Sequence, residues 1–336
     1  MKTLNTLMTV LAIIILASCS ANNSRTVDDI LNSPFRVYQI SGFEGPKIDI
    51  NKDSLAQFLV ALHYNIPLSD IKNELNWNPE TTESHIDALI ENRLLKREGG
   101  DLLPALGVFT LERGKLMELK ARNVANEIAD SIYNRLPEIK AIHDESHISQ
   151  RHDFRELSLF YLSNVVLDNF QIRQVEEEFL NQERPLRNGS RYYLGIVEDD
   201  LAADTEPYGM YGNRGLHWSD STGISVYGNR RTASNPGWDN YEDKNIHVFD
   251  EHDTELITQT MPDLFLPTLL DILEKNRPDF ETTYHELNFE EEISFEEFFI
   301  FWYHWIYTEA TDVLIERDII QEPQNDMFYY QIAVNF

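Results

Sequence analysis

Residues 78–109 carry the clearest fold signal in the chain and read NPETTESHIDALIENRLLKREGGDLLPALGVF. Asn78 followed by Pro79 is typical of a helix start, because Asn can cap the first turn and proline fits its first position. The apolar side chains that follow recur on one helical face, at Ile86, Leu89, Ile90 and Leu94. Glu98-Gly99-Gly100-Asp101 has the chemistry of a tight turn, so residues 94–109 predict a two-stranded hairpin.

Two shorter helical patterns precede this run, and a long one follows it. Asp53 can cap a first helix, Pro67 opens a second, and a long helix is predicted from about residue 111 to residue 136, where Pro137 ends it. Three helices, a tight second-to-third turn and a hairpin resemble a winged helix-turn-helix domain over residues 51–140. The resemblance covers about a quarter of the chain and implies a fold rather than a function.

The charges of this module argue against nucleic acid as a partner. In the winged-helix family the third helix enters the major groove with its N-terminal residues, and here that end carries Glu80, Glu83 and Asp87. Phosphate contacts require Lys or Arg, yet residues 52–97 hold five basic and seven acidic residues. We therefore expect a scaffold used for packing or protein contacts.

The N-terminus predicts export. Residues 1–19 have a basic start at Lys2, a ten-residue apolar run from Leu7 to Leu16 and small residues before Cys19, as secretory signals do. Leu16-Ala17-Ser18-Cys19 resembles the lipobox of bacterial lipoproteins, which implies cleavage before Cys19, diacylglycerol on its sulfur and acyl chains such as palmitate. Cys19 is the only cysteine, so no internal disulfide is expected. Ser20, next in the chain, is typical of lipoproteins sent to the outer membrane.

Composition indicates a globular, acidic protein. Apolar residues make up 42% and aromatic residues 11% of the chain. Removing residues 1–18 removes one basic residue, which changes the formal net charge from −29 to −30. Such a surface repels nucleic acid and anionic headgroups. We expect a signal peptide at 1–18, a lipidated tether with a short strand at 19–50, the winged-helix-like module at 51–140, and a second domain at 150–336.

Two segments contain histidines at spacings that could suit a metal ion. His143 and His147 would share one face of a helix, as zinc ligands do, but the order is not His-Glu-x-x-His. His152 follows them, and the segment is interpreted as a polar hinge between domains. In residues 244–253, an extended backbone would turn His247 away from Asp250 and His252, so a site there, which could also use Asp253, needs a bend. We predict no metal ligand and no cofactor.

Residues 188–241 differ from the rest of the chain, because eight of its fourteen glycines lie there. Two echoes, Tyr211-Gly212-Asn213-Arg214 and Tyr227-Gly228-Asn229-Arg230, combine hairpin-turn chemistry with aromatic rings and Arg. One interpretation is a twisted sheet. The other is a set of ligand-facing loops for a sugar or a small anion, with these candidate residues: Tyr211, Arg214, Trp218, Tyr227, Arg230 and Trp238.

The remaining patterns complete an α+β fold. We predict strands at 35–40 and 327–334, one helix over 154–180, another over 264–273, and an almost wholly buried helix that Ser294 caps. The predicted fold is the N-terminal winged-helix-like module followed by a mixed domain in which helices cover an antiparallel sheet.

Three functional hypotheses follow. The chain has no Gly-rich phosphate loop, no Gly-x-Ser-x-Gly elbow and no cysteine left for catalysis. The first hypothesis is a lipid-anchored cell-envelope protein that binds an envelope protein or a glycan without chemistry. The alternative is a metal-assisted hydrolase that uses His, Asp and Glu residues between 217 and 253. The third, an envelope-tethered DNA binder, lacks a basic face.

Overall fold

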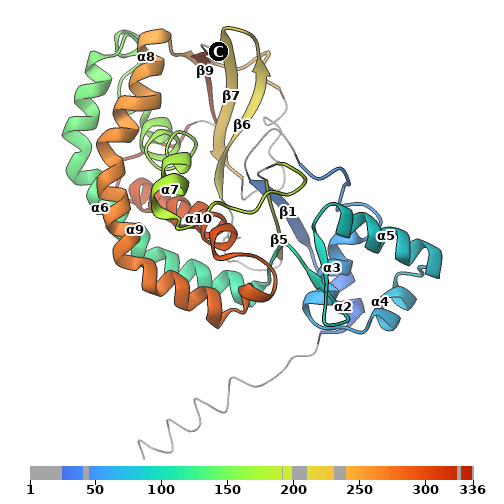
Figure 1. Ribbon diagram of the computed structural model, residues 1–336. Coiled ribbons are helices and arrows are strands. Elements are labelled where there is room, and N and C mark those ends of the chain that lie inside the picture. Colours follow the sequence, from blue (N-terminus) through green and yellow to red (C-terminus); the bar gives the residue numbers. More distant parts are fainter. Residues whose placement is uncertain are drawn as a thin grey trace, which may run out of the picture.

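The computed structural model describes residues 25–40, 45–190, 192–198, 210–230, 240–323 and 327–334 (Figure 1). The predicted signal peptide, the lipobox and Trp238 lie outside this range. Among the residues it covers, no helix is long and apolar enough to cross a membrane.

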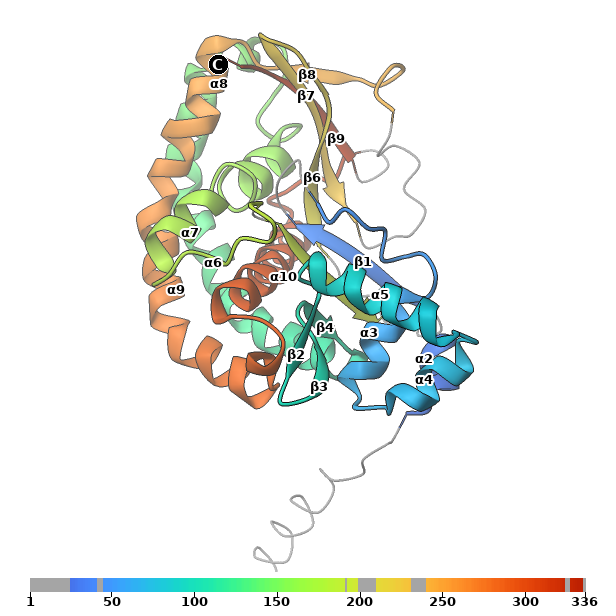
Figure 2. The same cartoon turned by 45° about the vertical axis from the view of Figure 1, so that its right-hand side comes forward.

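The helices and hairpin of residues 51–109 follow the predicted order. They are α3 (Leu55–His63), α4 (Leu68–Glu74), α5 (Pro79–Glu91), β2 (Leu95–Glu98) and β3 (Asp101–Pro104) (Figure 2). The segment predicted as a tether also contains a helix, α2 (Val27–Leu31), which buries Val27 and Ile30. Asn78 caps α5 as predicted, because its side-chain oxygen accepts from the Thr81 amide at 2.8 Å. The predicted cap of α3 is wrong: Ser54, not Asp53, is the N-cap residue, and its side chain makes no capping hydrogen bond.

A three-stranded sheet separates two hydrophobic cores. Strand β5 (Tyr193–Glu198) pairs antiparallel with β1 (Phe35–Ile40) and parallel with β4 (Gly107–Phe109). Side chains alternate along a strand, and in β5 Tyr193 and Val197 enter the larger core while Leu194 and Ile196 enter the smaller one. The second strand of the hairpin predicted over residues 94–109 is therefore split into two strands. Strand β3 pairs with β2, whereas β4 joins this three-stranded sheet.

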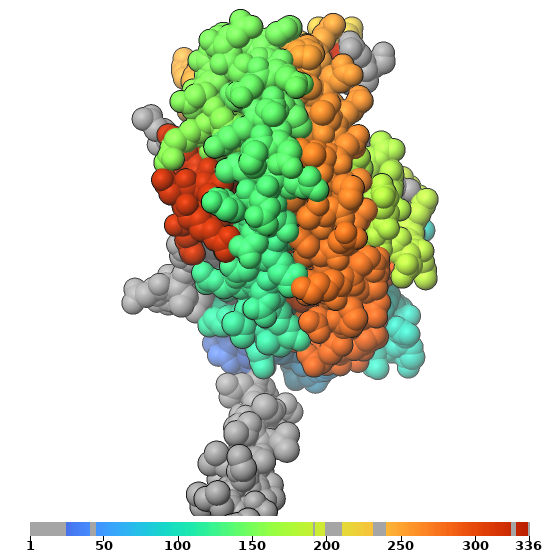
Figure 3. Space-filling model, turned by 90° about the vertical axis from the view of Figure 1, so that its left-hand side faces the viewer, coloured from blue at the N-terminus to red at the C-terminus, as the bar shows by residue number. Residues whose placement is uncertain are grey.

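The smaller core takes its side chains from residues 27–108 and, through β5 and the residue before it, from residues 192–196, whereas the larger core also takes Tyr38 and Ile40 from β1. Helix α6 (Leu111–Glu145), expected to end the N-terminal module, buries Met117, Ala125 and Ile132 in the larger core. Figure 3 shows α6 in green beside α9 (Met261–Glu286) in orange, and together they form one outer face of the molecule.

The prediction that Pro137 ends the long helix is wrong, because α6 continues through it to Glu145. Helix α9 likewise extends beyond the predicted range 264–273 and contains Pro267 and Pro278. All three prolines are exposed, so water can bind the carbonyl group that loses its amide donor, and packing of the opposite face maintains the helix.

Helix α10 (Phe295–Glu316) runs through the centre of the larger core. Its N-cap is Ser294, as predicted, which accepts from the Glu297 amide, and Trp302, Tyr303 and Tyr307 are buried. The prediction of one continuous helix over residues 154–180 is wrong. That segment forms the π-helix η3 (Phe160–Val165) and α7 (Ile172–Phe179), separated by a turn that buries Asp168 and Gln171.

The second sheet has the strand order β6-β7-β9-β8. Strands β6 (Tyr211–Trp218), β7 (Thr222–Asn229) and β9 (Met327–Ala333) are antiparallel, whereas β8 (Ile246–Val248) runs parallel to β9. The sheet is thus mixed, not purely antiparallel as predicted. Short elements complete the fold: η2 (Ile148–Gln150), α8 (Glu251–Glu255), η4 (Leu256–Thr260) and η5 (Phe289–Glu291).

Candidate functional site

Most of the described residues in 188–241 form the strands β5, β6 and β7. The two Tyr-Gly-Asn-Arg echoes lie on β6 and β7 and face each other across the ladder, with Tyr211 opposite Asn229 and Asn213 opposite Tyr227. Tyr211 is 1% and Tyr227 0% exposed, and their ring centroids lie 6.0 Å apart. Their rings therefore pack in the larger core and are not offered to a ligand from solvent, which corrects that part of the prediction.

The glycines of this hairpin accommodate side chains of the protein itself. A Cβ atom on Gly223 would lie 2.5 Å from the Trp218 ring, and one on Gly215 would lie 2.4 Å from its Nε1. A Cβ atom on Gly212 would lie 2.8 Å from Arg230 Cδ. These glycines therefore allow Trp218 and Arg230 to lie close to the backbone.

The six candidate residues do not form one described groove. Arg214 and Trp218 are exposed on β6, whereas Arg230 is half-buried, with its guanidinium carbon 5.9 Å from the centre of the Tyr38 ring. Burial lowers the pKa of Arg230. Trp238 lies outside the described residues, so its role stays a prediction.

A buried polar cluster that contains Asp168 and His304 lies under this sheet. Asp168 Oδ1 is 4.0 Å from His304 Nε2, and the His304 Nδ1 group donates to the Ile300 carbonyl at 2.7 Å. Burial raises the pKa of Asp168 to about 7 and lowers that of His304 to about 4. Asp168 Oδ2 and both amide atoms of Asn164 have no hydrogen-bond partner among the described residues.

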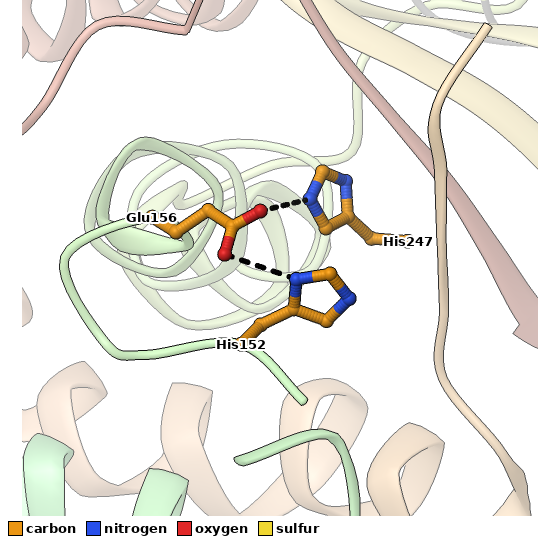
Figure 4. Close-up of side chains that lie close together, drawn as sticks. All are labelled: His152, Glu156 and His247. Atoms are coloured by element: carbon orange, nitrogen blue, oxygen red, sulfur yellow. Dashed lines mark hydrogen bonds and ion pairs between the residues drawn. The ribbon is translucent and has the colours of Figure 1, made fainter. Parts of the chain in front are cut away.

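The structure brings the two histidine segments together, which neither segment predicts alone. One group, the His152 cluster, consists of His152, Glu156 and His247, and Figure 4 shows both rings directed at the carboxylate. His152 Nδ1 lies 3.0 Å from Glu156 Oε2, and His247 Nε2 lies 3.2 Å from Glu156 Oε1. Burial alone would raise the pKa of Glu156, but hydrogen bonds with both histidines lower it.

A second group, the His147 cluster, consists of His147, Asp250 and Asp253. His147 Nδ1 lies 2.8 Å from Asp250 Oδ2, and the His147 amide donates to Asp253 Oδ1 at 2.6 Å. Asp250 also caps α8 by accepting from the Asp253 amide at 3.0 Å. His147 and Asp250 are exposed, so this cluster already forms a solvated ion pair.

His143 and His252, the other two histidines of these segments, belong to neither cluster. His143 is buried, and its Nδ1 lies 3.2 Å from the Tyr161 hydroxyl. His252 Nε2 lies 3.2 Å from the Glu145 carbonyl. A site built from His143 and His147 on one helix, the alternative to a polar hinge, is therefore not the arrangement observed, because each cluster combines residues from both segments.

Comparison with known proteins identifies no relative: no family model, no curated protein and no solved structure matches this chain.

Proposed function

We propose that this chain is a lipid-anchored protein of the bacterial cell envelope that binds a protein or glycan partner and does not bind nucleic acid. Acyl chains on Cys19 would hold it at the outer membrane. Burying each acyl CH₂ contributes about 0.8 kcal/mol, so two or three chains make attachment essentially permanent. The support for this anchor is the lipobox-like Leu16-Ala17-Ser18-Cys19.

The observation that carries the binding role is the exposed acidic face of α5. The order of α3, α4, α5 and the β2–β3 hairpin supports a winged-helix-like module, in which α5 takes the place of the DNA-reading helix. Its exposed face carries four acidic residues: Glu80, Glu83, Asp87 and Glu91. Such a face repels phosphate and complements a basic partner surface.

The hairpin does not supply the missing positive charge. Arg97 Nη2 lies 3.4 Å from Glu83 Oε2, and Lys96 Nζ lies 3.5 Å from Glu98 Oε2, so both cations sit beside carboxylates. A DNA-binding protein instead needs several cations directed at phosphates.

Retention on heparin and duplex DNA tests this proposal. A form of the chain that begins at Ser20 should elute at physiological salt, because its surface is acidic. A charge-reversed control, Glu80→Lys with Glu83→Lys and Asp87→Lys, should be retained more strongly if α5 is the exposed face. Micromolar DNA binding by the unmodified chain, with a steep salt dependence, would refute the proposal.

One observation favours the alternative, a metal-assisted hydrolase. Three of the acidic and histidine residues between 217 and 253, namely His247, Asp250 and Asp253, lie in the two clusters described above. A site with three protein ligands leaves a coordination position for water, as catalytic zinc sites do.

A further inference from the structure

We infer that His152, Glu156 and His247 bind one divalent transition-metal ion of the zinc type. The inference is independent of the partner-binding role, because this cluster lies near β8, at the opposite end of the molecule from α5 (Figure 2).

The hydrogen bonds of His247 assign its proton. Its Nδ1 lies 3.1 Å from the Tyr329 carbonyl oxygen, which can only accept, so Nδ1 carries hydrogen. Nε2 is then the remaining ring position, and it lies 3.2 Å from Glu156 Oε1. A hydrogen on Nε2 makes the hydrogen bond to Glu156 described above, and a metal ion between the two atoms would replace that hydrogen.

The same hydrogen bond is the usual support of a metal-binding histidine. Such histidines donate their second ring N–H to a backbone carbonyl or carboxylate, which fixes the tautomer and the ring orientation. In this protein β9 supplies the carbonyl. The ring is also stacked on Phe328, with centroids 4.3 Å apart and planes inclined by 12°, and its side chain is only 9% exposed. His247 is thus held in place before any ion arrives.

The spacing of the three side chains fits a tetrahedral ion. Zinc–nitrogen and zinc–oxygen bonds of about 2.0–2.2 Å place neighbouring ligand atoms roughly 3.4 Å apart. His152 Nδ1 and His247 Nε2 lie 3.0 and 3.2 Å from the two different oxygens of Glu156, and the ligand atoms of the cluster all lie within 4.8 Å of one another. An ion bound by one Glu156 oxygen would need that carboxylate to turn one oxygen toward both nitrogens.

The donor set selects the class of metal. Imidazole suits zinc, copper, iron and nickel, whereas calcium and magnesium take oxygen ligands. Two imidazoles and one carboxylate match the His₂Glu set of catalytic zinc sites. The Glu156 side chain is 44% exposed, so water can reach the cluster and complete the coordination.

The ion would also connect two layers of the fold. His247 comes from β8 in the sheet, whereas His152 and Glu156 come from the segment between η2 and η3. These segments are separated by about ninety residues, so an ion bound only by the folded state should raise the melting temperature.

Calorimetric titration of the whole chain with Zn²⁺, after removal of metal with a chelator, tests the inference. Wild type should bind an ion at this cluster. His247→Gln and Glu156→Gln should each weaken binding at least about tenfold, since even loss of a residue that only orients a ligand costs about 10–100-fold. His285→Gln is the matched control, because His285 is 66% exposed and belongs to neither cluster.

A second readout identifies the ligands directly. Co²⁺ in place of Zn²⁺ should give the intense visible absorption of a four-coordinate ion in wild type and in His285→Gln, and lose it in His247→Gln. If His247→Gln fails to fold, Glu156→Gln gives the same comparison from an exposed position. Absence of saturable Zn²⁺ binding would mean that a second proton on His247 faces Glu156, and would overturn the inference. Loss of binding in His147→Gln but not in His247→Gln or Glu156→Gln would also overturn it.

Discussion

Glu292→Ala removes a carboxylate that three elements of the structure share. Glu292 Oε1 lies 2.6 Å from His63 Nδ1 of α3 and 2.8 Å from Arg113 Nη1 of α6, and Oε2 accepts from the Val108 amide of β4 at 2.9 Å. Its side chain is 5% exposed. His63 borders the smaller core and Arg113 the larger one, so this carboxylate connects the two cores.

The expected loss of stability follows from the buried groups that lose their partner in Glu292→Ala. Removing one partner of a buried ion pair costs about 3–5 kcal/mol, because the other charge stays buried without compensation. Arg113 keeps hydrogen bonds to the carbonyl groups of Val108, Leu287 and Asn288, which favours the lower end. The Val108 amide loses its acceptor, which adds to the cost. We expect the free energy of unfolding to fall by about 3–4 kcal/mol.

Urea unfolding followed by tryptophan fluorescence and by circular dichroism measures this loss. Glu291→Ala is the control, because Glu291 is exposed beside Glu292 and should change stability by less than about 0.5 kcal/mol. Equal stability of the two variants would refute the claim that Glu292 connects the cores.

Repeating the unfolding experiment at several pH values tests the role of the Glu292 charge. Burial alone would raise the pKa of Glu292, but the His63 hydrogen bond and the charge of Arg113 lower it overall. A carboxyl whose pKa is lowered by folding stabilises the protein above its unfolded pKa, and this contribution is lost as pH falls through the folded value. The gap between wild type and Glu292→Ala should therefore shrink on acidification. A gap that widens would contradict the assignment.

Three further predictions concern other parts of the molecule. Burial raises the pKa of Asp168 to about 7 and lowers that of His304 to about 4, so folding binds a proton at Asp168 and releases one at His304. Between these values, pH-dependent unfolding should show the stability of Asp168→Asn rising with pH relative to wild type and that of His304→Gln falling. Gly195→Ala should destabilise by about 1–3 kcal/mol in thermal unfolding, because its Cβ would meet the Phe301 ring, and a neutral result would contradict this packing. Cys19→Ser should yield an unacylated precursor, whereas wild type should carry acyl chains by mass spectrometry; an unacylated wild type with an intact Met1 would refute the lipoprotein assignment.

The sequence predicted the elements whose signals are local. Asn78 caps α5 and Ser294 caps α10, each by accepting a hydrogen bond from the backbone amide three residues later. A cap of this kind can be predicted from the residue type and the start of the apolar pattern that follows it. The strand at Phe35–Ile40 likewise follows from its residue pattern. Helix ends at proline were predicted wrongly because one missing hydrogen bond, on an exposed face, is outweighed by packing of the other face.

The candidate site could not be predicted in the same way. His152 and His247 are distant in sequence, and an extended backbone in residues 244–253 would turn His247 away from Asp250 and His252. The turn after η2 and the parallel pairing of β8 with β9 bring them together. The Gly-rich hairpin was interpreted wrongly for a related reason. The glycines indicate that some group packs closely against the backbone, but the sequence does not show that the groups are the side chains of Trp218 and Arg230.

Anomalous X-ray scattering at the zinc edge, from crystals of the Zn²⁺-loaded chain, tests the metal assignment most directly. The metal assignment predicts one anomalous peak between the three side chains, which marks a Zn²⁺ ion about 2.0–2.2 Å from His247 Nε2, His152 Nδ1 and a Glu156 oxygen. The Tyr329 carbonyl should still accept from His247 Nδ1. A loaded crystal with no anomalous peak between these three side chains, or with its peak at His147, Asp250 and Asp253, would contradict it.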